Sequence, residues 1–320
     1  MKKDICKLIG IKYPIFQGAM TFVSDKYLVA AVSNAGGLGI FAPGDDSARG
    51  GAEWLREQIQ SIRKLTDKPF GVNLPIRSPI IADMVDVLCE EKVKVATTGG
   101  GNPAPYIAQM KEAGIIVAPV VPDAKTTLKM QQAGADMVIA SGMEAGGFVG
   151  NVTTMVTLPQ ITSAVDIPVV AAGGIADGKG LAAAIAMGAS GVQMGTRFML
   201  SKECTIPEVF KVAMIKATSK DAVAVHSKLR NGPALRVLRN KVVDDLLAYE
   251  KENHAEASVY EDKFDSSRYE HFLREGRVDE LLLGMGEVAG SIHEILSVED
   301  IINNMIKEYE DIVKDMPSFS

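Results

Sequence analysis

The stretch that decides the fold is PVVAAGGIADG, residues 168–178, in which a short apolar run passes directly into two glycines. Similar short runs, rich in β-branched residues, recur at 14–18, 37–41, 70–74, 93–97, 115–120, 136–140, 167–172 and 191–195. Strands that are apolar throughout are typical of parallel sheets covered on both faces. The sequence therefore predicts eight buried parallel strands.

The gaps between these runs each have room for one helix. Apolar residues repeat with a helical period of about 3.6 residues at 54–65, 80–89, 106–113 and 126–133. Strands that alternate with helices in this way define the α/β class. Eight such units favour a (β/α)8 TIM barrel over the alternative, an open doubly wound sheet.

The last third of the chain has a different pattern. From about residue 203 the sequence is charged and helix-rich, without the alternation expected of strands, and 250–265 is its most polar stretch. We therefore expect a barrel over residues 1–202 and a helical extension over 203–320. This extension is placed to cover the mouth of the barrel as a lid.

Charge and composition exclude several classes of protein. The formal charge is −6 and the sequence pI is about 5.4, with no concentrated basic face for a nucleic acid. No apolar run is long enough to cross a membrane, and no secretory signal is present, so we expect a cytoplasmic protein. The spacing of Cys6, Cys89 and Cys204 fits neither a metal site nor a CxxC motif, which favours reduced thiols and no metal.

Glycines follow several of the predicted strands, on the face where barrel enzymes place their active sites. Gly173 and Gly174 follow the seventh strand, and Gly195 and Thr196 follow the eighth. Exposed backbone amides at these positions predict a phosphate cradle, and the alternative is a pair of tight turns. Asn73 ends the third strand with a polar amide, which either contacts a bound ligand or caps the next turn.

Several motifs closely resemble the nitronate monooxygenase family, and within it the FMN-dependent enoyl-acyl carrier protein reductase II branch. The resemblance covers nearly the whole chain. Its motifs are YPIFQGAM (13–20), NAGGLG (34–39), KPFGVN (68–73), MEAGG (143–147), PVVAAGGIADG (168–178), QMGTRF (193–198) and GMGEVAG (284–290).

This resemblance implies an FMN barrel with NADH or NADPH as electron donor. It also implies a homodimer that acts on a small molecule or an acyl thioester, in reactions such as those of fatty acid biosynthesis. The segment 284–290 would return from the extension to touch the flavin. The residues expected to bind the cofactor are Gly18, Ala19, Met20, Asn73, Ser141, Gly146, Gly147, Gly173, Gly174, Gly195, Thr196, Met285 and Gly286.

The chain departs from the family pattern at four positions. Phe148 stands where the family has a histidine that serves as base or proton donor, and Ser141 replaces an acidic residue. Ala19 replaces a glycine, and Glu287 replaces a glutamine. Since phenylalanine cannot exchange a proton, the catalytic acid or base is unassigned. His226 is a candidate replacement, and the alternative is a surface histidine.

The sequence predicts an FMN-dependent NAD(P)H oxidoreductase of the enoyl reductase II type, which reduces an enoyl thioester or a related electron-poor acceptor. One alternative is a nitronate monooxygenase that oxidises alkyl nitronates with oxygen. Another is an FMN-binding regulatory protein that has lost its histidine. Inosine monophosphate dehydrogenases need a cysteine after strand six, and residues 141–154 contain none. Barrel 2-hydroxy-acid oxidases need a His and Arg pair that strand seven lacks.

Overall fold

The computed structural model describes residues 4–44, 51–225, 234–251 and 266–317. Its main sheet has eight parallel strands in the spatial order β1-β9-β8-β6-β5-β4-β3-β2. All eight predicted strands form. They are β1 (Ile15–Gln17), β2 (Gly39–Phe41), β3 (Phe70–Pro75), β4 (Val95–Gly99), β5 (Ile116–Val121), β6 (Val138–Ser141), β8 (Val169–Ala172) and β9 (Gly191–Met194).

The sheet closes on itself between β1 and β2. Phe16 and Leu38 form a parallel bridge across this seam. The N–H of Gln17 donates to the carbonyl of Leu38 at 2.9 Å, and the N–H of Leu38 donates to the carbonyl of Ile15 at 2.9 Å. These bonds confirm the closed barrel and rule out the open sheet.

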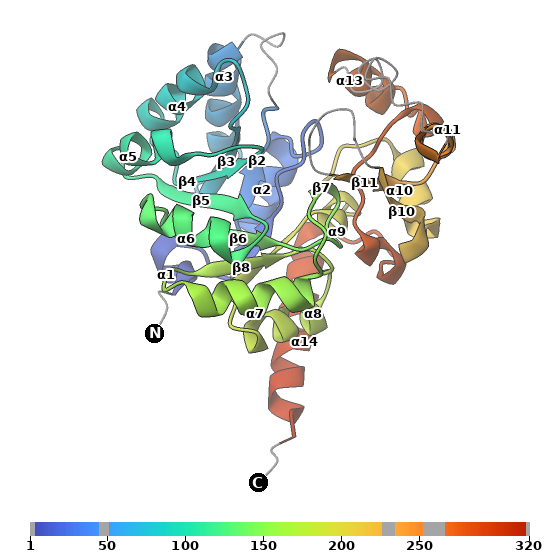
Figure 1. The fold of residues 1–320 in the computed structure, drawn as a ribbon. Helices are drawn as coiled ribbons and strands as arrows, with labels where there is room; N and C mark the ends of the chain where they lie inside the picture. The colour runs from blue at the N-terminus through green and yellow to red at the C-terminus, as the bar shows by residue number, and fades with distance from the viewer. Residues whose placement is uncertain (1–3, 45–50, 226–233, 252–265, 318–320) are drawn as a thin grey trace.

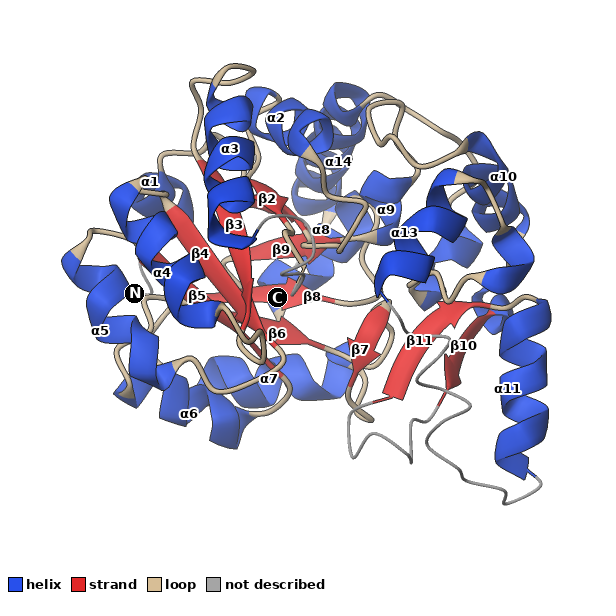
Figure 2. Ribbon diagram, turned by 90° about the horizontal axis from the view of Figure 1, so that it is seen from above, coloured by secondary structure: helices blue, strands red, loops and turns tan. Residues whose placement is uncertain are grey.

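An outer ring of helices surrounds the strands (Figures 1 and 2). The four predicted helical patterns correspond to α3, α4, α5 and α6. The short helix α1 (Ile5–Ile9) precedes the barrel. The ring includes α2 (Lys26–Asn34), α3 (Gly51–Arg63), α4 (Ile81–Glu90), α5 (Ala104–Glu112), α6 (Ala124–Gln132), α7 (Thr154–Ala164) and α8 (Gly178–Ala186).

The barrel interior is packed with apolar side chains at one end. Apolar side chains from the strands, such as Val95, Ile116 and Ile139, form one buried cluster with Ile5 and Ile9 of α1. Side chains alternate between the two faces of a strand, so residues two or four positions further along these strands also face the interior. The residues that follow them at the carboxyl ends are more exposed, as Val120 of β5 shows at 37%. The carboxyl ends of the strands are called here the mouth of the barrel.

The C-terminal part contains two strands that the sequence analysis did not predict. β10 (Ala222–Val225) and β11 (Ala234–Leu238) pair antiparallel, and β11 also pairs with β7 (Gly147–Val149) of the β6–α7 connection. The expectation of an extension without strands was wrong. The short helix α9 (Thr196–Met199) follows β9. The helical elements of the extension before the last helix include α10 (Glu208–Lys216), η2 (Ser219–Asp221), α11 (Lys241–Lys251), α13 (Ser266–Arg274), η3 (Val278–Glu280) and η4 (Glu287–Ser291).

The last helix, α14 (Val298–Asp315), returns to the barrel and packs against α8 and α2 (Figure 1). The Glu308 carboxylate accepts a hydrogen bond from the N–H of Gly178 at 2.8 Å and pairs with Lys179 at 3.5 Å. Chain order therefore places residues 203–296 between the last strand and the last helix of the barrel. In the described parts of the chain, no helix is long and apolar enough to cross a membrane.

Candidate active site at the barrel mouth

The turn after β1 carries Gly18, Ala19 and Met20 and is held by two buried polar side chains, Gln17 and Ser24. The Gln17 amide donates to the hydroxyl of Ser24 at 2.7 Å and also to the carbonyl of Gly18. The same hydroxyl accepts the N–H of Met20 at 2.9 Å. The turn is therefore fixed without any ligand.

Gln17 also connects the turn to the neighbouring strand. Its Oε1 accepts the N–H of Ile40 in β2 at 3.1 Å, and its side chain is fully buried. Sequence reasoning quoted Gln17 in a motif but assigned it no role. A polar side chain at the end of an apolar strand was the signal that could have identified Gln17 as a structural residue.

The side-chain oxygen of Asn73 in β3 already accepts a hydrogen bond. Its Oδ1 accepts the hydroxyl of Thr97 in β4 at 3.0 Å, and Thr97 is buried. In the described part of the chain, nothing accepts a hydrogen bond from its Nδ2. Asn73 therefore presents two N–H donors at a half-buried position of the mouth, which suits the carbonyl oxygens of a ligand ring.

The phosphate cradle predicted after β8 and β9 has backbone donors to offer. Gly173 and Gly174 have φ values of +99° and +73°, a conformation that glycine adopts readily. Among the described residues, no acceptor lies within hydrogen-bonding distance of the N–H groups of Gly174 or Thr196. The start of α8 is not part of the cradle, because the Asp177 carboxylate accepts the N–H of Gly180 at 2.9 Å and Glu308 binds Gly178.

The loop between β6 and β7 is braced by Glu144. Its carboxylate accepts the N–H of Thr154 at 2.9 Å and the Thr154 hydroxyl at 2.9 Å. A side chain at Gly142 would clash with Thr154, since a Cβ there would lie 2.0 Å from the hydroxyl oxygen. The loop that carries Ser141, Gly146 and Gly147 is thus pinned to the start of α7.

The C-terminal segment that the resemblance predicts at the flavin lies against the end of β9 and the β6–β7 loop. Met285 is fully buried, and the N–H of Gly286 donates to the hydroxyl of Thr196 at 3.0 Å. The N–H of Glu287 donates to the carbonyl of Glu144 at 3.0 Å. A Cβ on Gly146 would lie 2.8 Å from the backbone of Met285 and Gly286. Residues 284–287, here called the return segment, therefore touch both the β6–β7 loop and the end of β9.

The turn after β1 meets the end of β9 and the C-terminal region. A Cβ on Gly195 would lie 3.4 Å from the sulfur of Met20. Phe22, which has a φ of +66°, stacks on Tyr269 of α13 with ring centroids 5.2 Å apart. Burial raises the pKa of the Tyr269 hydroxyl above its usual range, so this residue stays protonated. Segments from both ends of the chain thus surround one mouth.

Comparison with known proteins shows the family to which this arrangement belongs. A sequence model of the nitronate monooxygenase family matches residues 2–86 and 80–308. The chain belongs to the nitronate monooxygenase family. Proteins of this family are FMN-dependent flavoproteins, and the chain is an oxidoreductase.

Three relatives represent different activities within the family. FabK from Thermotoga maritima, an enoyl-acyl carrier protein reductase II, is 42% identical with a TM-score of 0.92, covering 99% of this chain and 98% of that one. A (3aS,4S,5R,7aS)-5-hydroxy-7a-methyl-1-oxo-octahydro-1H-indene-4-carboxyl-CoA dehydrogenase of Rhodococcus jostii is 41% identical, covering 77% of this chain and 68% of the relative. A probable nitronate monooxygenase of Staphylococcus aureus is 30% identical, covering 78% of this chain and 81% of the relative.

The mouth fits the FMN expected in this family. Glycines bring the backbone close at the end of β9, unpaired N–H groups are available at Gly174 and Thr196, and the Asn73 amide has free donors. No Cβ contact lies within 4 Å at Gly147, so space remains beside the β6–β7 loop. The residues assigned to the cofactor remain a prediction, and they lie on six segments: the turn after β1, β3, the β6–β7 loop, the ends of β8 and β9, and the return segment.

Phe148 stands in β7 at the position of the family histidine. Its side chain is 63% exposed, and in the ladder it pairs with Leu235 of β11. His226, the candidate to replace the histidine, lies outside the described residues. The cysteines are poor replacements, because burial raises the pKa of the Cys204 thiol to about 11 and that of Cys6 to about 11.

Sequence reasoning missed Arg236 of β11, which connects the site to the C-terminal region. This side chain is buried within an otherwise apolar strand, and its Nε donates to the carbonyl of Met143 in the β6–β7 loop at 2.9 Å. A charged residue in the run ALRVL (234–238) was the signal that could have revealed it.

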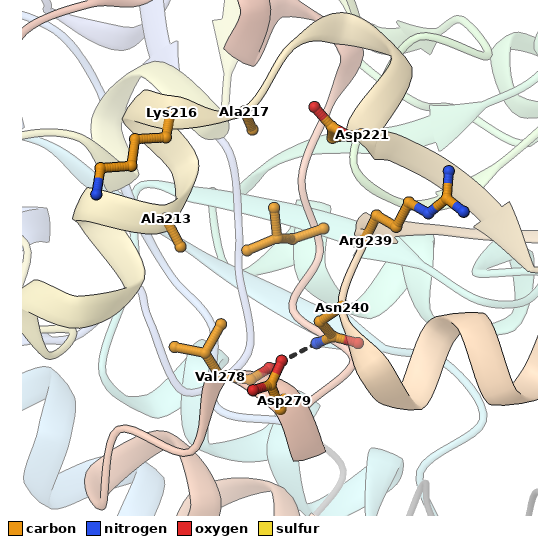
Figure 3. Close-up of a pocket in the computed structure, with 9 residues that line it drawn as sticks. Ala213, Lys216, Ala217, Asp221, Arg239, Asn240, Val278 and Asp279 are labelled. Carbon is orange, nitrogen blue, oxygen red and sulfur yellow. Dashed lines mark hydrogen bonds between the residues drawn. The ribbon is translucent and has the colours of Figure 1, made fainter.

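A surface depression of about 250 Å³ lies in the C-terminal region, and none of the predicted cofactor residues lines it. Figure 3 shows Lys216 and Arg239 on its rim and Asn240 at its base, where the amide donates to the carbonyl of Val278 at 2.6 Å.

Proposed function

We propose that this chain is an FMN-dependent NAD(P)H oxidoreductase of the enoyl-acyl carrier protein reductase II type, which reduces an enoyl thioester or a related electron-poor acceptor. When bound, FMN would supply the chemistry of hydride transfer from the nicotinamide to the acceptor. The protein binds and orients these partners. The high identity to FabK and to a dehydrogenase of a carboxyl-CoA supports a thioester as the substrate class.

One observation favours reduction over the oxidation of a neutral nitroalkane. Between Gly142 and Val149 the only carboxylate is that of Glu144, and it is held by the N–H and the hydroxyl of Thr154. The histidine position holds Phe148. Oxidation of a nitroalkane requires a base to remove its proton, and this loop presents none, whereas hydride transfer relies mainly on orientation.

The chain's own side chains have distinct roles in this proposal. Asn73 offers its free amide donors to the polar edge of the flavin ring, while Thr97 fixes the orientation of the amide. Gly174 and Thr196 offer backbone N–H groups to the phosphate. Ala19 and Met20 line the ring, on a turn that Gln17 and Ser24 hold rigid.

Phe148 gives the acceptor side of the mouth an apolar surface. In the three-stranded sheet, Phe148, Leu235 and Val225 pair in register and therefore share one face. Their exposure falls from 63% at Phe148 through half-buried Leu235 to 1% at Val225. This surface supports an acceptor with an apolar acyl chain or ring system, which would pack on the phenyl ring.

The first experiment is the visible spectrum of the purified protein, followed by anaerobic titration with NADH and with NADPH. We expect flavin bands that one of the two nucleotides bleaches. Reoxidation of the reduced protein should then be faster with an enoyl thioester, such as a crotonyl thioester, than with a quinone or with oxygen. The same titration identifies the preferred nucleotide.

Other outcomes would point to the alternatives. Flavin bands that persist with both nucleotides, together with oxygen uptake on an alkyl nitronate, would overturn the reductase proposal in favour of a nitronate monooxygenase. An intact flavin that no donor and no acceptor turns over would favour a binding or regulatory role. The homodimer implied by the family is part of the proposal, and sedimentation of the holoprotein tests it.

A further inference from the structure

Arg236 is a charged side chain in a place where burial makes charge costly. Only 5% of the residue is exposed, and its neighbours Val237 and Leu238 in β11 are also buried. A guanidinium in such a place needs hydrogen-bond partners for its N–H groups. Its partners come from three separate segments of the chain.

The first partner is the β6–β7 loop, through the bond from Nε to the carbonyl of Met143 at 2.9 Å. The second is the start of β10, where Nη1 donates to the carbonyl of Ala222 at 2.6 Å. The third is the return segment, where Nη1 lies 2.8 Å from Oε1 of Glu287. One planar side chain therefore joins three segments.

The backbone of Arg236 binds the same two neighbours as its side chain. In the β7–β11 ladder Arg236 pairs with Gly147, and its carbonyl accepts the N–H of Met285 at 3.3 Å. Gly147 and Met285 both belong to the predicted cofactor site. Loosening Arg236 would therefore change the distance between the β6–β7 loop and the return segment.

We propose that Arg236 is a positioning residue for the flavin site, and that Glu287 completes it as the matching counter-charge. The pair clamps the return segment against the β6–β7 loop, so that Gly146 and Gly286 stay in contact. This inference rests on the proposed binding of FMN at the barrel mouth. It adds that cofactor affinity depends on a residue of β11, outside every motif that the sequence analysis assigned to the cofactor.

The main test replaces Arg236 with methionine and with lysine and measures the dissociation constant of FMN by equilibrium dialysis. We expect Arg236→Met to weaken FMN binding by at least roughly tenfold, because the two segments lose their common partner. Arg236→Lys should recover little of this loss, since a single ammonium lacks the planar fork that reaches three acceptors. Arg239→Met is the matched control. Arg239 follows the same strand, is exposed and pairs with Asp244, so this variant should bind FMN as the native protein does.

Two variants of Glu287 separate positioning from simple loss of folding. Glu287→Gln keeps an oxygen acceptor for Arg236 and should change the FMN dissociation constant by less than roughly threefold. It leaves the guanidinium without its counter-charge, so the reduction potential of the bound flavin should become more positive. Glu287→Ala leaves both carbonyl bonds of Arg236 intact and should weaken FMN binding in a protein that still folds.

The outcomes distinguish this inference from the proposed function. Native FMN affinity in folded Arg236→Met, or in Glu287→Ala if Arg236→Met does not fold, would overturn the positioning role. An unchanged flavin potential in Glu287→Gln would overturn the counter-charge role. Both measurements are made without an acceptor. If the native protein binds FMN but reduces no thioester, only the enoyl reductase proposal is overturned, and the positioning role of Arg236 is not affected.

Discussion

The two halves of the candidate site are held in place by different means. The half at the ends of β1, β3 and β9 belongs to the barrel, and short bonds fix it, such as the one from the N–H of Gly18 to the carbonyl of Met194 at 2.8 Å. The other half consists of the β6–β7 loop and the return segment. Residues of the C-terminal region take part in its bonds, as between Gly286 and Thr196 or Arg236 and Met143.

This difference separates cofactor binding from acceptor choice. The turn after β1 is fixed by bonds within the barrel, so we expect it to keep its geometry when the loop half changes. Of the four departures from the family pattern, Phe148 and Glu287 lie in the loop half, Ser141 ends β6 where that loop begins, and Ala19 lies in the barrel half. Variation in acceptor within one flavoprotein family is expected from such a division, since the scaffold holds the cofactor and loops set specificity.

Gly146→Val is the substitution that should disturb the loop half of the site most while leaving the barrel half unchanged. A Cβ at this position would lie 2.8 Å from the N–H nitrogen of Gly286, so the return segment must move away. Overpacking of this kind costs about 1–3 kcal/mol, and we expect FMN affinity to fall roughly tenfold to a hundredfold. Flavin release on dialysis measures this fall.

The control for Gly146→Val is Gly150→Ala, where the nearest heavy atom to a new Cβ is 3.9 Å away. Gly150 lies in the connection after β7, on the same side of the molecule as Gly146. If both variants lost FMN equally, the loop would be sensitive to any change and the contact between Gly146 and the return segment would not be the cause.

The barrel half of the site should be disturbed most by a substitution at Gln17. Gln17→Leu removes the acceptor for the N–H of Ile40 and the donor to Ser24, both in buried surroundings. Each buried group left without a partner costs about 1–3 kcal/mol, so we expect the free energy of unfolding to fall by about 2–4 kcal/mol. Urea denaturation of the FMN-free protein measures it.

Ser24→Ala provides the comparison for Gln17→Leu. It leaves the bond between Gln17 and Ile40 across the β1–β2 seam intact and should lower the free energy of unfolding by about 1 kcal/mol. Equal losses in the two variants would show that the seam bond to Ile40 contributes little, and that the β1 turn alone depends on these residues.

The sequence revealed the barrel half of the site much better than the loop half. Apolar runs followed by glycine mark strands and their carboxyl ends locally, so the eight strands and the turn after β1 were predictable. The contact of Gly146 with Gly286 involves residues far apart in the chain, and only the family resemblance suggested it. The partner of a buried charge such as Arg236 depends on packing that no local pattern encodes.

The strands β10 and β11 were missed for a related reason. The runs AVAV (222–225) and ALRVL (234–238) are short and lie among charged residues, so they carry little pattern of their own. They form strands because β7 offers an edge for β11 to pair with. Similarly, α14 could not be assigned to the barrel from its own amphipathic pattern, because the helix it packs against, α8, lies far back in the sequence.

Restoring the family histidine tests whether a change in the loop half affects reoxidation of the flavin without affecting its reduction. In Phe148→His we expect the reduction of flavin by NAD(P)H to stay within about twofold of the native rate, since the barrel half is unchanged. Reoxidation by a small enoyl thioester should rise by roughly tenfold or more, with a new dependence on pH, because an imidazole supplies a proton. Stopped-flow spectroscopy resolves the two half-reactions.

Phe148→Leu is the control that keeps an apolar side chain without the ring. It should leave both half-reactions close to native for a small acceptor and weaken the binding of acceptors that stack on the phenyl ring. A Phe148→His variant in which reoxidation slows for every acceptor would show that the loop has been rebuilt around phenylalanine, and the proton would then come from solvent.

The smallest expected effect tests how far the loop half extends into the C-terminal region. Asp221 ends η2, and its carboxylate accepts the backbone N–H and the hydroxyl of Thr218, each at 2.8 Å. The same turn packs on η4 after the return segment, where a Cβ on Gly290 would lie 2.5 Å from the Ser219 hydroxyl oxygen. The backbone bond from Thr218, followed by the bond from its hydroxyl, lowers the pKa of Asp221 below 3.8.

This lowered pKa fixes the sign of the pH dependence. The ionised carboxylate is favoured in the folded state, so its contribution to stability is complete above the unfolded pKa and is lost as the pH falls through the lower folded pKa. Asp221→Asn should therefore be slightly less stable than the native protein at pH 7, and the gap should narrow below about pH 4. Asp315→Asn, at the exposed end of α14, is the control for the loss of one negative charge. If Asp221→Asn also weakened FMN binding, η2 would belong to the loop half of the site, and native binding would limit that half to the return segment and its clamp.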